Sequence, residues 1–371
     1  MRVHDVPVVT PYRLDLTVSV LRRLSTNVVD LLTPQGTYVR ALSGFAQPVI
    51  VRATQVTRRR ALSVTIEGSA HNDTAVLALV RQMLGVDRDL RQFYRAAKRI
   101  PWLAPLVKRM RGVKPPRYPT LWEACANAIV FQQLSIRAAS AIMHRLTVAA
   151  GECIQAGGVP VPLYLFPTAE RFQHERDERL RTFGLSANKI ATLRRVAQSL
   201  ESGALDAAML EQSTSADAAA TLCRIKGVGP WTATIILLRG LGRLDVFPGN
   251  DTSVASNVAL VAGSEPPDVQ HVLDALGTQR GMLYFHLLLG RLEAHGDIGR
   301  QSFTASIPDV TDGPRVEDAA RWHSIRIMRR RADSRLWQIA SSQRRRSGSG
   351  CGLPSCPDTS SPERPMDHAR C

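Results

Sequence analysis

The sequence has no long apolar run, few cysteines and very few lysines. None of its hydrophobic stretches approaches the ~20 apolar residues that a membrane-spanning helix needs. The first residues, MRVHDVPVVTPYRLD, lack the apolar core of a secretory signal. Six cysteines in 371 residues are too sparse for a disulfide framework. We therefore expect a soluble, cytoplasmic protein with no membrane partner.

Lysine supplies only five of the 48 basic residues, so arginine carries almost all of the positive charge. The 48 basic residues exceed the 32 acidic ones, and the formal net charge is +16 at pH 7. A GC-rich genome explains a high ratio of arginine to lysine, but it does not explain the surplus over acidic residues. Because the planar guanidinium group suits phosphate recognition, the charge favours a nucleic-acid partner.

The composition and the positions of the prolines predict three regions in the chain. Hydrophobic residues make up 44% and charged residues 22%, which is ordinary for a globular protein and excludes wholesale disorder. Prolines at 115, 116 and 119 mark a boundary between an N-terminal domain at 1–115 and a second domain at 116–300. Residues 301–371 hold two arginine clusters and many serines and prolines, so we predict a basic, disordered tail.

The first region mixes strand and helix patterns. Apolar residues alternate along RLDLTVSV, which predicts a half-buried strand at 14–20. QPVIVRATQV and ALSVTIEG predict two further strands, with TRRR as the turn between them. Helices are expected at 74–84 and at DLRQFYRAAK. We therefore predict an α+β domain in which helices lie beside a small antiparallel sheet.

The second region is predicted to be all-α. Ser135 and Ser186 are good N-caps for helices at SIRAASAIMHRL and SANKIATLRRVAQSL. A glycine- and proline-rich linker, GGVPVPLYLFP, separates them. Further helices are expected at LWEACANAIVFQQ, DAAATLCRI, WTATIILLRG, TSVASNVALV and RGMLYFHLLLGRL.

The most specific stretch is LCRIKGVGPWTATIILLRG, at residues 222–240. One helix is expected to end near Ile225, and the GVG sequence then turns tightly into a second helix. The two glycines permit positive φ angles and a close backbone approach. Pro230 suits the first helical position, because no hydrogen bond is lost there. The second helix therefore opens with free N–H groups, which form a phosphate site, and carbonyl groups of the turn are candidates to hold a monovalent cation.

A glycine-rich connection with no ligand is the alternative interpretation of this turn. The apolar residues around it and the basic chain favour DNA instead. We predict a helix-hairpin-helix whose DNA-phosphate contact is formed by Ile225, Gly227, Val228, Gly229 and Thr232.

Asp251 lies 22 residues after the second hairpin glycine, within PGNDTSV. Pro248 and Gly249 interrupt the chain, and a new helix is expected to begin at about Thr252. A carboxylate at a helix N-terminus is favoured by the helix dipole, so Asp251 should stay ionised. Taken alone, this residue would be a helix cap.

Together these pieces resemble the helix-hairpin-helix DNA glycosylase superfamily, whose signature is a hairpin, a Gly/Pro-rich loop and an essential aspartate. Here the signature reads GVGPWTA…DVFPGND, and the matching aspartate is Asp251. Within the superfamily the chain is most similar to 3-methyladenine DNA glycosylase II. IVFQQLSIRAAS at 129–140 and FGLSANKIATLRRVA at 183–197 resemble two segments of that family, and an α+β N-terminal domain also fits it. The resemblance covers about residues 12–298.

The resemblance implies an enzyme of base excision repair that flips a damaged base out of double-stranded DNA and hydrolyses its N-glycosidic bond. Asp251 is then the catalytic residue, a carboxylate that stabilises the positive charge developing on the sugar and orients the attacking water. Gln133 or Leu134 is placed like the family's wedge, which fills the gap left by the base. A polar turn residue that caps the next helix is the alternative for this position.

The residue two positions after the second hairpin glycine distinguishes the subclasses of the superfamily. Bifunctional relatives carry a lysine there that forms a Schiff base; this chain has Trp231, and Lys226 precedes the glycines. We therefore predict a glycosylase without lyase activity. The only cysteines beyond the aspartate are Cys351, Cys356 and Cys371, in the tail, so we expect no iron–sulfur cluster and no other cofactor.

Three aromatic residues are candidates to line the base pocket: Trp231, Phe131 and Tyr284. An indole face attracts the positive charge of a base methylated at N3 or N7, which favours 3-methyladenine or 7-methylguanine as the substrate. Helical spacing makes the same residues core positions in the alternative interpretation. The family usually has an aromatic residue just before the arginine that is Arg280 here, and this chain has Gln279.

Two other functions fit the same sequence. The first is a non-catalytic DNA-binding protein that recognises damaged or distorted DNA. The second is a glycosylase for uracil or oxidised bases, which shares the scaffold and differs in pocket contacts. In each case we expect a monomer.

Overall fold

The computed structural model describes residues 1–68, 73–159, 161–249, 252–263 and 267–298. Asp251 and the predicted tail therefore lie outside the described residues. Met1–Gln301 group into one unit by their contacts, and the domain boundary near residue 115 stays a prediction.

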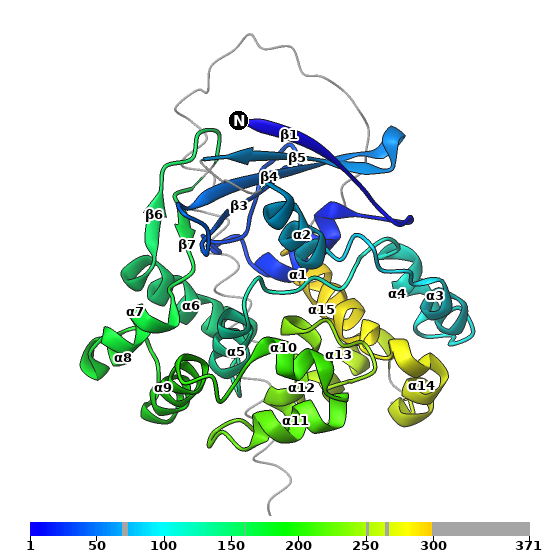
Figure 1. The fold of residues 1–371 in the computed structure, drawn as a ribbon. Coiled ribbons are helices and arrows are strands. Elements are labelled where there is room, and N and C mark those ends of the chain that lie inside the picture. Colours follow the sequence, from blue (N-terminus) through cyan, green and yellow to red (C-terminus); the bar gives the residue numbers. More distant parts are fainter. Residues whose placement is uncertain (69–72, 160, 250–251, 264–266, 299–371) are drawn as a thin grey trace, which may run out of the picture. The chain divides into compact units, whose positions relative to one another are not determined.

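The N-terminal region is built on a five-stranded antiparallel sheet with the order β1-β5-β4-β3-β2 (Figure 1). The long strands alternate between buried and more exposed residues, and in the register Val6 pairs with Leu62 and Ala53 with Val64. Its strands are β1 (Arg2–Pro7), β2 (Leu31–Leu32), β3 (Tyr38–Leu42), β4 (Val49–Val56) and β5 (Ala61–Glu67).

The predicted sheet and the β4–β5 hairpin are confirmed, and a short 3₁₀ turn at Thr57–Arg59 joins the two strands. Helix α2 (Asp73–Leu84) and helix α3 (Arg91–Ala97) lie where helices are predicted. Strands β1, β2 and β3 were not predicted.

The strand predicted at 14–20 is wrong, because this segment forms helix α1 (Leu14–Arg22). Two apolar stripes at helical spacing produce the apparent alternation. Leu14 and Val18 face the core under the sheet, whereas Leu16 and Val20 face the core of the helical region. An amphipathic helix is predicted from a single apolar stripe in its sequence. A helix that is buried on two sides has no such single stripe.

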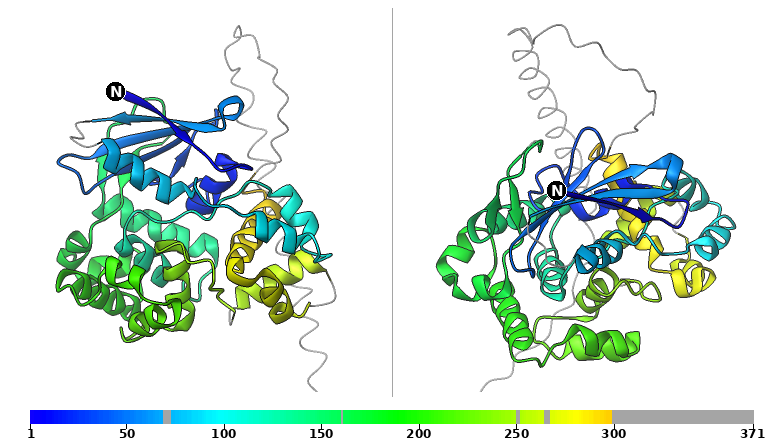
Figure 2. Two further views of the ribbon diagram at one scale, coloured as in Figure 1. Left: turned by 45° about the vertical axis from the view of Figure 1, so that its right-hand side comes forward. Right: turned by 45° about the horizontal axis from the view of Figure 1, so that its top comes forward.

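Helices α1 and α2 pack under one face of the sheet (Figure 2). Part of the other face, at Val39 and Ile50, contacts a small two-stranded sheet of β6 (Glu152–Ile154) and β7 (Leu163–Leu165). Strand β7 lies within the segment predicted as a linker, so that prediction is wrong there. The apolar residues Leu163 and Leu165 are buried against the N-terminal sheet.

The second region is helical, as predicted. Ser135 and Ser186 cap helices α6 and α9, since their hydroxyl oxygens accept from the N–H groups of Ala138 and Lys189. The helices of this region include α5 (Leu121–Val130), α6 (Ile136–Ala150), α9 (Ala187–Glu201), α11 (Ser215–Cys223), α12 (Pro230–Gly240), α13 (Thr252–Ala262) and α15 (Met282–Ala294). The shorter helices were not predicted: α4 (Ala104–Arg109), α7 (Ala169–His174), α8 (Asp177–Thr182), α10 (Ala207–Gln212) and α14 (Val269–Leu276).

A buried ionic cluster connects the two regions. Arg40 of β3 donates to Asp30 at 2.7 Å and to Glu123 of α5 at 2.5 Å, and Tyr38 donates its hydroxyl to Asp30. These side chains are almost completely buried. The cluster therefore fixes the start of α5 against the sheet.

No helix in the described part of the chain is long and apolar enough to cross a membrane.

Candidate nucleic-acid interface and base-binding cleft

The predicted hairpin turn joins α11 to α12. Gly229 is the N-cap of α12 and Pro230 is its first residue, as predicted. Gly227 has a φ of +101° and uses the conformational freedom of glycine, whereas Gly229 has a φ of −93°. The turn is closed by a hydrogen bond in which the Val228 N–H donates to the Ile225 carbonyl. A turn of this kind needs one residue in the left-handed conformation, and Gly227 is that residue.

The two glycines differ in what surrounds them. A Cβ atom on Gly227 would lie 2.0 Å from the Oγ1 atom of Thr192 in α9, whereas a Cβ atom on Gly229 would meet nothing within 4 Å. Gly227 is therefore required by internal packing. Gly229 has no such requirement within the chain, and it leaves the backbone at the start of α12 open to an external molecule.

Three carbonyl groups of the turn already accept protein donors. The carbonyl of Ile225 accepts from Val228, that of Lys226 from Arg195, and that of Gly227 from Gln132. Each carbonyl oxygen has two lone pairs, so a cation at these oxygens would share each of them with the protein donor. The cation at the hairpin stays a prediction.

A second turn, between α5 and α6, lies opposite the hairpin. Gln133 and Leu134 are both exposed here, and Gln133 has a φ of +53°, which is unusual for a residue other than glycine. Gln132 of the same turn reaches the hairpin, where its amide nitrogen donates to Thr232 Oγ1 at 2.6 Å and to the Gly227 carbonyl at 3.1 Å. Thr232 is 2% exposed as a whole residue, so neither its side chain nor its backbone is open to solvent.

One cleft brings the two turns together. It encloses about 2410 Å³ of empty space, part of it open to solvent. The predicted site residues that line it are Phe131, Gln133, Leu134, Gly227, Gly229, Trp231, Thr232 and Tyr284. Ile225 and Val228 do not line it, and the Val228 side chain is buried.

The far wall of the cleft comes from α13 and α15. Val254, Ser256 and Asn257 of α13 line it, together with Arg291, which donates to Asn257. Asp251 lies outside the described residues, so its role stays a prediction.

Two guanidinium groups surround Tyr284 in this cleft. Burial alone would raise the pKa of the Tyr284 phenol, but Arg239 and Arg23 lower it below its ordinary value. The Cζ atom of Arg23 lies 3.6 Å from the centre of the Phe131 ring. The inner part of the cleft is therefore aromatic and positively charged.

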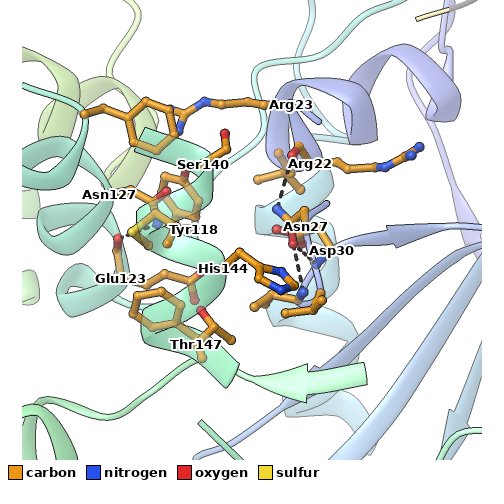
Figure 3. A pocket seen from close by; sticks show the side chains of 16 residues that line it. Arg22, Arg23, Asn27, Asp30, Tyr118, Glu123, Asn127, Ser140, His144 and Thr147 are labelled. Carbon is orange, nitrogen blue, oxygen red and sulfur yellow. Dashed lines mark hydrogen bonds between the residues drawn. The ribbon is translucent and has the colours of Figure 1, made fainter. Parts of the chain in front are cut away.

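Arg23 also lines a smaller cavity between the N-terminal region and helices α5 and α6 (Figure 3). This cavity has about 460 Å³ of empty space. In Figure 3, Asn27 and Asp30 lie on one side of it and Asn127 on the other, while His144 of α6 reaches across, where its Nδ1 atom pairs with the Thr26 carbonyl at 2.8 Å. The segment after α1 therefore contributes a wall of the site that the sequence did not predict.

Three residues of the site were missed by sequence reasoning. Arg23 sits in a segment that was predicted to follow a strand, and no local pattern points to a role for it. Gln132 and Lys189 lie within the two segments that resemble the glycosylase family, next to residues that were selected. Their contacts depend on distant parts of the chain, which a local pattern does not encode.

Gln279 stands where the family usually has an aromatic residue, and here it has a structural use. Its side-chain oxygen accepts from the Phe93 N–H at 2.7 Å, and its amide nitrogen donates to the Asp89 carbonyl at 2.8 Å. Gln279 thus binds the backbone at the start of α3 and does not line the cleft.

Metal-binding side chains are not clustered in the described residues, where no group of three or more His, Cys, Asp or Glu could hold an ion. Cys125, Cys153 and Cys223 are free thiols. Cys351, Cys356 and Cys371 lie outside the described residues, and the expected absence of an iron–sulfur cluster stays a prediction.

Comparison with known proteins defines the class. Residues 126–277, which include both turns, match the HhH-GPD superfamily base excision DNA repair protein model. This part of the chain belongs to the HhH-GPD superfamily, so the predicted helix-hairpin-helix domain is confirmed.

The more particular likeness is to 3-methyladenine glycosylases. The chain is 26% identical over 186 residues to the DNA-3-methyladenine glycosylase of Bacillus subtilis, covering 50% of this chain and 61% of the relative. It is 32% identical over 153 residues to DNA-3-methyladenine glycosylase 1 of Schizosaccharomyces pombe, covering 40% of this chain and 62% of that protein. The chain thus spans about three fifths of these two relatives.

A solved structure shares the fold. It is the 3-methyladenine DNA-glycosylase from Archaeoglobus fulgidus, with a TM-score of 0.65 and 24% identity over 78% of this chain and 99% of that chain. At this identity the likeness shows the fold alone.

Proposed function

We propose that the protein is a monofunctional DNA glycosylase that flips an alkylated base out of duplex DNA and hydrolyses its N-glycosidic bond. The observation that carries this proposal is the single cleft in which the hairpin turn, the α5–α6 turn and the aromatic residues meet. The named relatives, which are DNA-3-methyladenine glycosylases, support the same reaction.

The start of α12 supplies the contact with the DNA backbone. Pro230 has no N–H, and the first helical hydrogen bond of α12 runs from Ala233 to the Gly229 carbonyl. The N–H groups of the hairpin turn and of the first turn of α12 lie at the positive end of the helix dipole. With Gly229 open on its outer side, these groups can bind a phosphate oxygen without a charged side chain.

The α5–α6 turn supplies the wedge. Leu134 is 39% exposed although it is a large apolar residue, and it lies on the rim of the same cleft. An apolar side chain in this place can occupy the space that a flipped base leaves in the stack, with Gln133 beside it.

The flipped base enters between Trp231, Phe131 and Tyr284. The face of Trp231 attracts a base that carries a positive charge after methylation at N3 or N7, whereas Arg23 already lies over the Phe131 ring. The charge also weakens the glycosidic bond, so a modest catalytic contribution suffices. Lesions of the 3-methyladenine and 7-methylguanine type are therefore the proposed substrates.

Asp251 is the proposed catalytic residue. Val254, three residues further along the sequence, lines the cleft. As the bond between C1′ and the base nitrogen breaks, the base leaves with the electron pair and positive charge develops on the sugar. The carboxylate stabilises this charge and orients a water molecule, whose oxygen bonds to C1′ while its proton is released.

Lyase activity would require a free lysine amine near C1′. Trp231 occupies the position of the lysine in bifunctional enzymes. Lys189 is the lysine that lines the cleft, and its ammonium group donates to the carbonyls of Val130 and Gln132 at 2.7 and 2.9 Å. We therefore expect no covalent adduct on borohydride reduction in the presence of an abasic duplex.

The test is release of free base from methylated duplex DNA, measured by chromatography, for the wild type and Asp251→Asn. We expect 3-methyladenine or 7-methylguanine from the wild type and a loss of about 10²–10³-fold in the variant, with binding of the duplex retained. A non-catalytic DNA-binding protein would bind with a salt-dependent affinity and release nothing from any damaged duplex. Release of uracil or oxidised bases alone would assign the enzyme to another substrate class.

Damaged double-stranded DNA is the proposed partner, and a monomer in the cytoplasm is the proposed working form. Sedimentation of the protein with and without a duplex of about 15 base pairs would test the stoichiometry of one to one.

A further inference from the structure

We propose that Gln132 is a positioning residue that couples binding of the DNA backbone at the hairpin to the position of the wedge at Gln133 and Leu134. This inference rests on the proposed function. Gln132 does not itself reach the reacting atoms. Its proposed role is to connect the two turns of the cleft mechanically.

The side chain of Gln132 bridges segments that lie about 95 residues apart in the sequence. Its amide nitrogen has two N–H groups, and both have acceptors on the hairpin: Thr232 Oγ1 at 2.6 Å and the Gly227 carbonyl at 3.1 Å. A carbonyl oxygen only accepts, so it fixes which end of the carboxamide faces the hairpin. This nitrogen is therefore committed to the protein and is not available to read a base.

The backbone of the same turn is fixed from a third helix. Lys189 of α9 donates from Nζ to the carbonyls of Val130 and Gln132, on either side of Phe131. Helix α5, which leads into the turn, packs against both α9 and α12 (Figure 1). The turn thus has one attachment through the main chain of Gln132 and another through its side chain.

The wedge follows immediately after this anchored residue. Gln133 adopts a left-handed conformation at a φ of +53°, and Leu134 is exposed on the rim. A residue other than glycine persists in this region of φ/ψ space when its surroundings over-determine it. The hydrogen bonds of Gln132 and Lys189 are the surroundings that hold the backbone just before it.

The position of the hairpin contacts gives the coupling its direction. Gly227 and Thr232 flank the N–H groups that are proposed to bind phosphate. A phosphate bound there orders the hairpin turn, to which the Gln132 side chain is hydrogen-bonded. Gln132 then fixes the position of the wedge. Because a flipped base tends to return to the stack, a wedge that is held rigidly keeps the base in the pocket for longer.

The test uses the full-length protein with Gln132→Met, which keeps the length of the side chain and removes both donors. Gln212→Met is the matched control, because Gln212 is exposed at the end of α10 and belongs to neither turn. Three quantities are measured for each protein: affinity for an undamaged duplex, fluorescence of 2-aminopurine placed beside the lesion, and the single-turnover rate of base release.

We expect Gln132→Met to bind the undamaged duplex within threefold of the wild type. The fluorescence rise should fall by at least half, and the single-turnover rate should fall 10- to 100-fold. Thr232→Val removes the acceptor from the other side, so the double variant with Gln132→Met should be no slower than the slower single variant. Gln212→Met should match the wild type in all three measurements.

A residue with a merely structural role would change the affinity for the undamaged duplex together with the rate. The coupling is overturned if Gln132→Met keeps the full fluorescence rise, or if its rate loss accompanies an equal loss of duplex affinity. If the wild type releases no base but still gives the fluorescence rise, the proposed function fails and the fluorescence of Gln132→Met decides the coupling. If the wild type gives neither signal, both proposals fail.

Discussion

A Cβ atom added to Gly227 would lie 2.0 Å from the Oγ1 atom of Thr192, in the wall of α9 against which the hairpin turn packs. Gly227 also has a φ of +101°. Gly227→Ala should therefore lower the free energy of unfolding by about 2–4 kcal/mol, because overpacking and an unfavourable φ both act against it. Urea unfolding followed by circular dichroism measures this change.

Gly229→Ala should behave in the opposite way, although the two glycines are only two residues apart. Its φ of −93° suits alanine, and the added methyl group would meet nothing within 4 Å. The free energy of unfolding should change by less than about 1 kcal/mol. Affinity for duplex DNA should fall at least tenfold, because the methyl group stands where a phosphate approaches. An unchanged affinity in Gly229→Ala would show that DNA does not contact this face of the hairpin.

The sequence predicts the helical region well because its helices carry their own start signals. Ser135 and Ser186 form the expected caps, and Pro230 opens α12 as expected. Helix α1 was predicted as a strand because both of its faces are buried, one by the sheet and one by helices. Burial on two sides is a property of the tertiary structure. A single sequence shows only the resulting order of apolar residues along the helix.

The site was predictable where the chemistry lies in a short motif. The hairpin glycines, Trp231 and Leu134 were selected from local patterns, and the structure brings them to one cleft. Arg23 and Gln132 were missed because their contacts bridge segments about 100 residues apart. A local pattern does not record which distant side chain will complete a hydrogen bond.

The ionic cluster around Arg40 should be essential for stability. Arg40→Met leaves Asp30 and Glu123 buried without their ion-pair partner, so the free energy of unfolding should fall by about 3–5 kcal/mol. Arg59→Met is the matched control: Arg59 pairs with Asp5 at 3.3 Å on the surface, and its loss should cost less than about 1 kcal/mol.

The pH dependence of Arg40→Met provides a second check. Burial already raises the pKa of Glu123 in the wild type, and Arg40 opposes this. Without Arg40 the pKa in the folded state should rise further above the unfolded value. A carboxyl group of this kind stabilises the fold only while it is protonated, so the deficit of the variant should grow as the pH rises from about 5 to 8. A deficit that is independent of pH would contradict this account.

His286 should make the fold sensitive to mild acid. The ring is completely buried, its Nδ1 atom pairs with the Met282 carbonyl at 2.8 Å, and its centre lies 4.8 Å from that of the Phe93 ring. Burial lowers the pKa of His286 to about 4, against an ordinary value of 6.5. The unfolded chain therefore binds a proton between pH 6.5 and 4 that the folded chain rejects, and stability is lost as the pH falls through this window.

The size of this effect follows from the shift of the pKa, at 1.36 kcal/mol per unit, and amounts to about 3 kcal/mol over the whole window. His286→Phe keeps a ring of similar size and removes the titration. We expect the variant to be less stable than the wild type at pH 7, because the bond to Met282 is lost, but to lose less stability between pH 6.5 and 4. Urea midpoints at half-unit intervals of pH measure both slopes, and equal slopes would show that acid acts elsewhere in the protein.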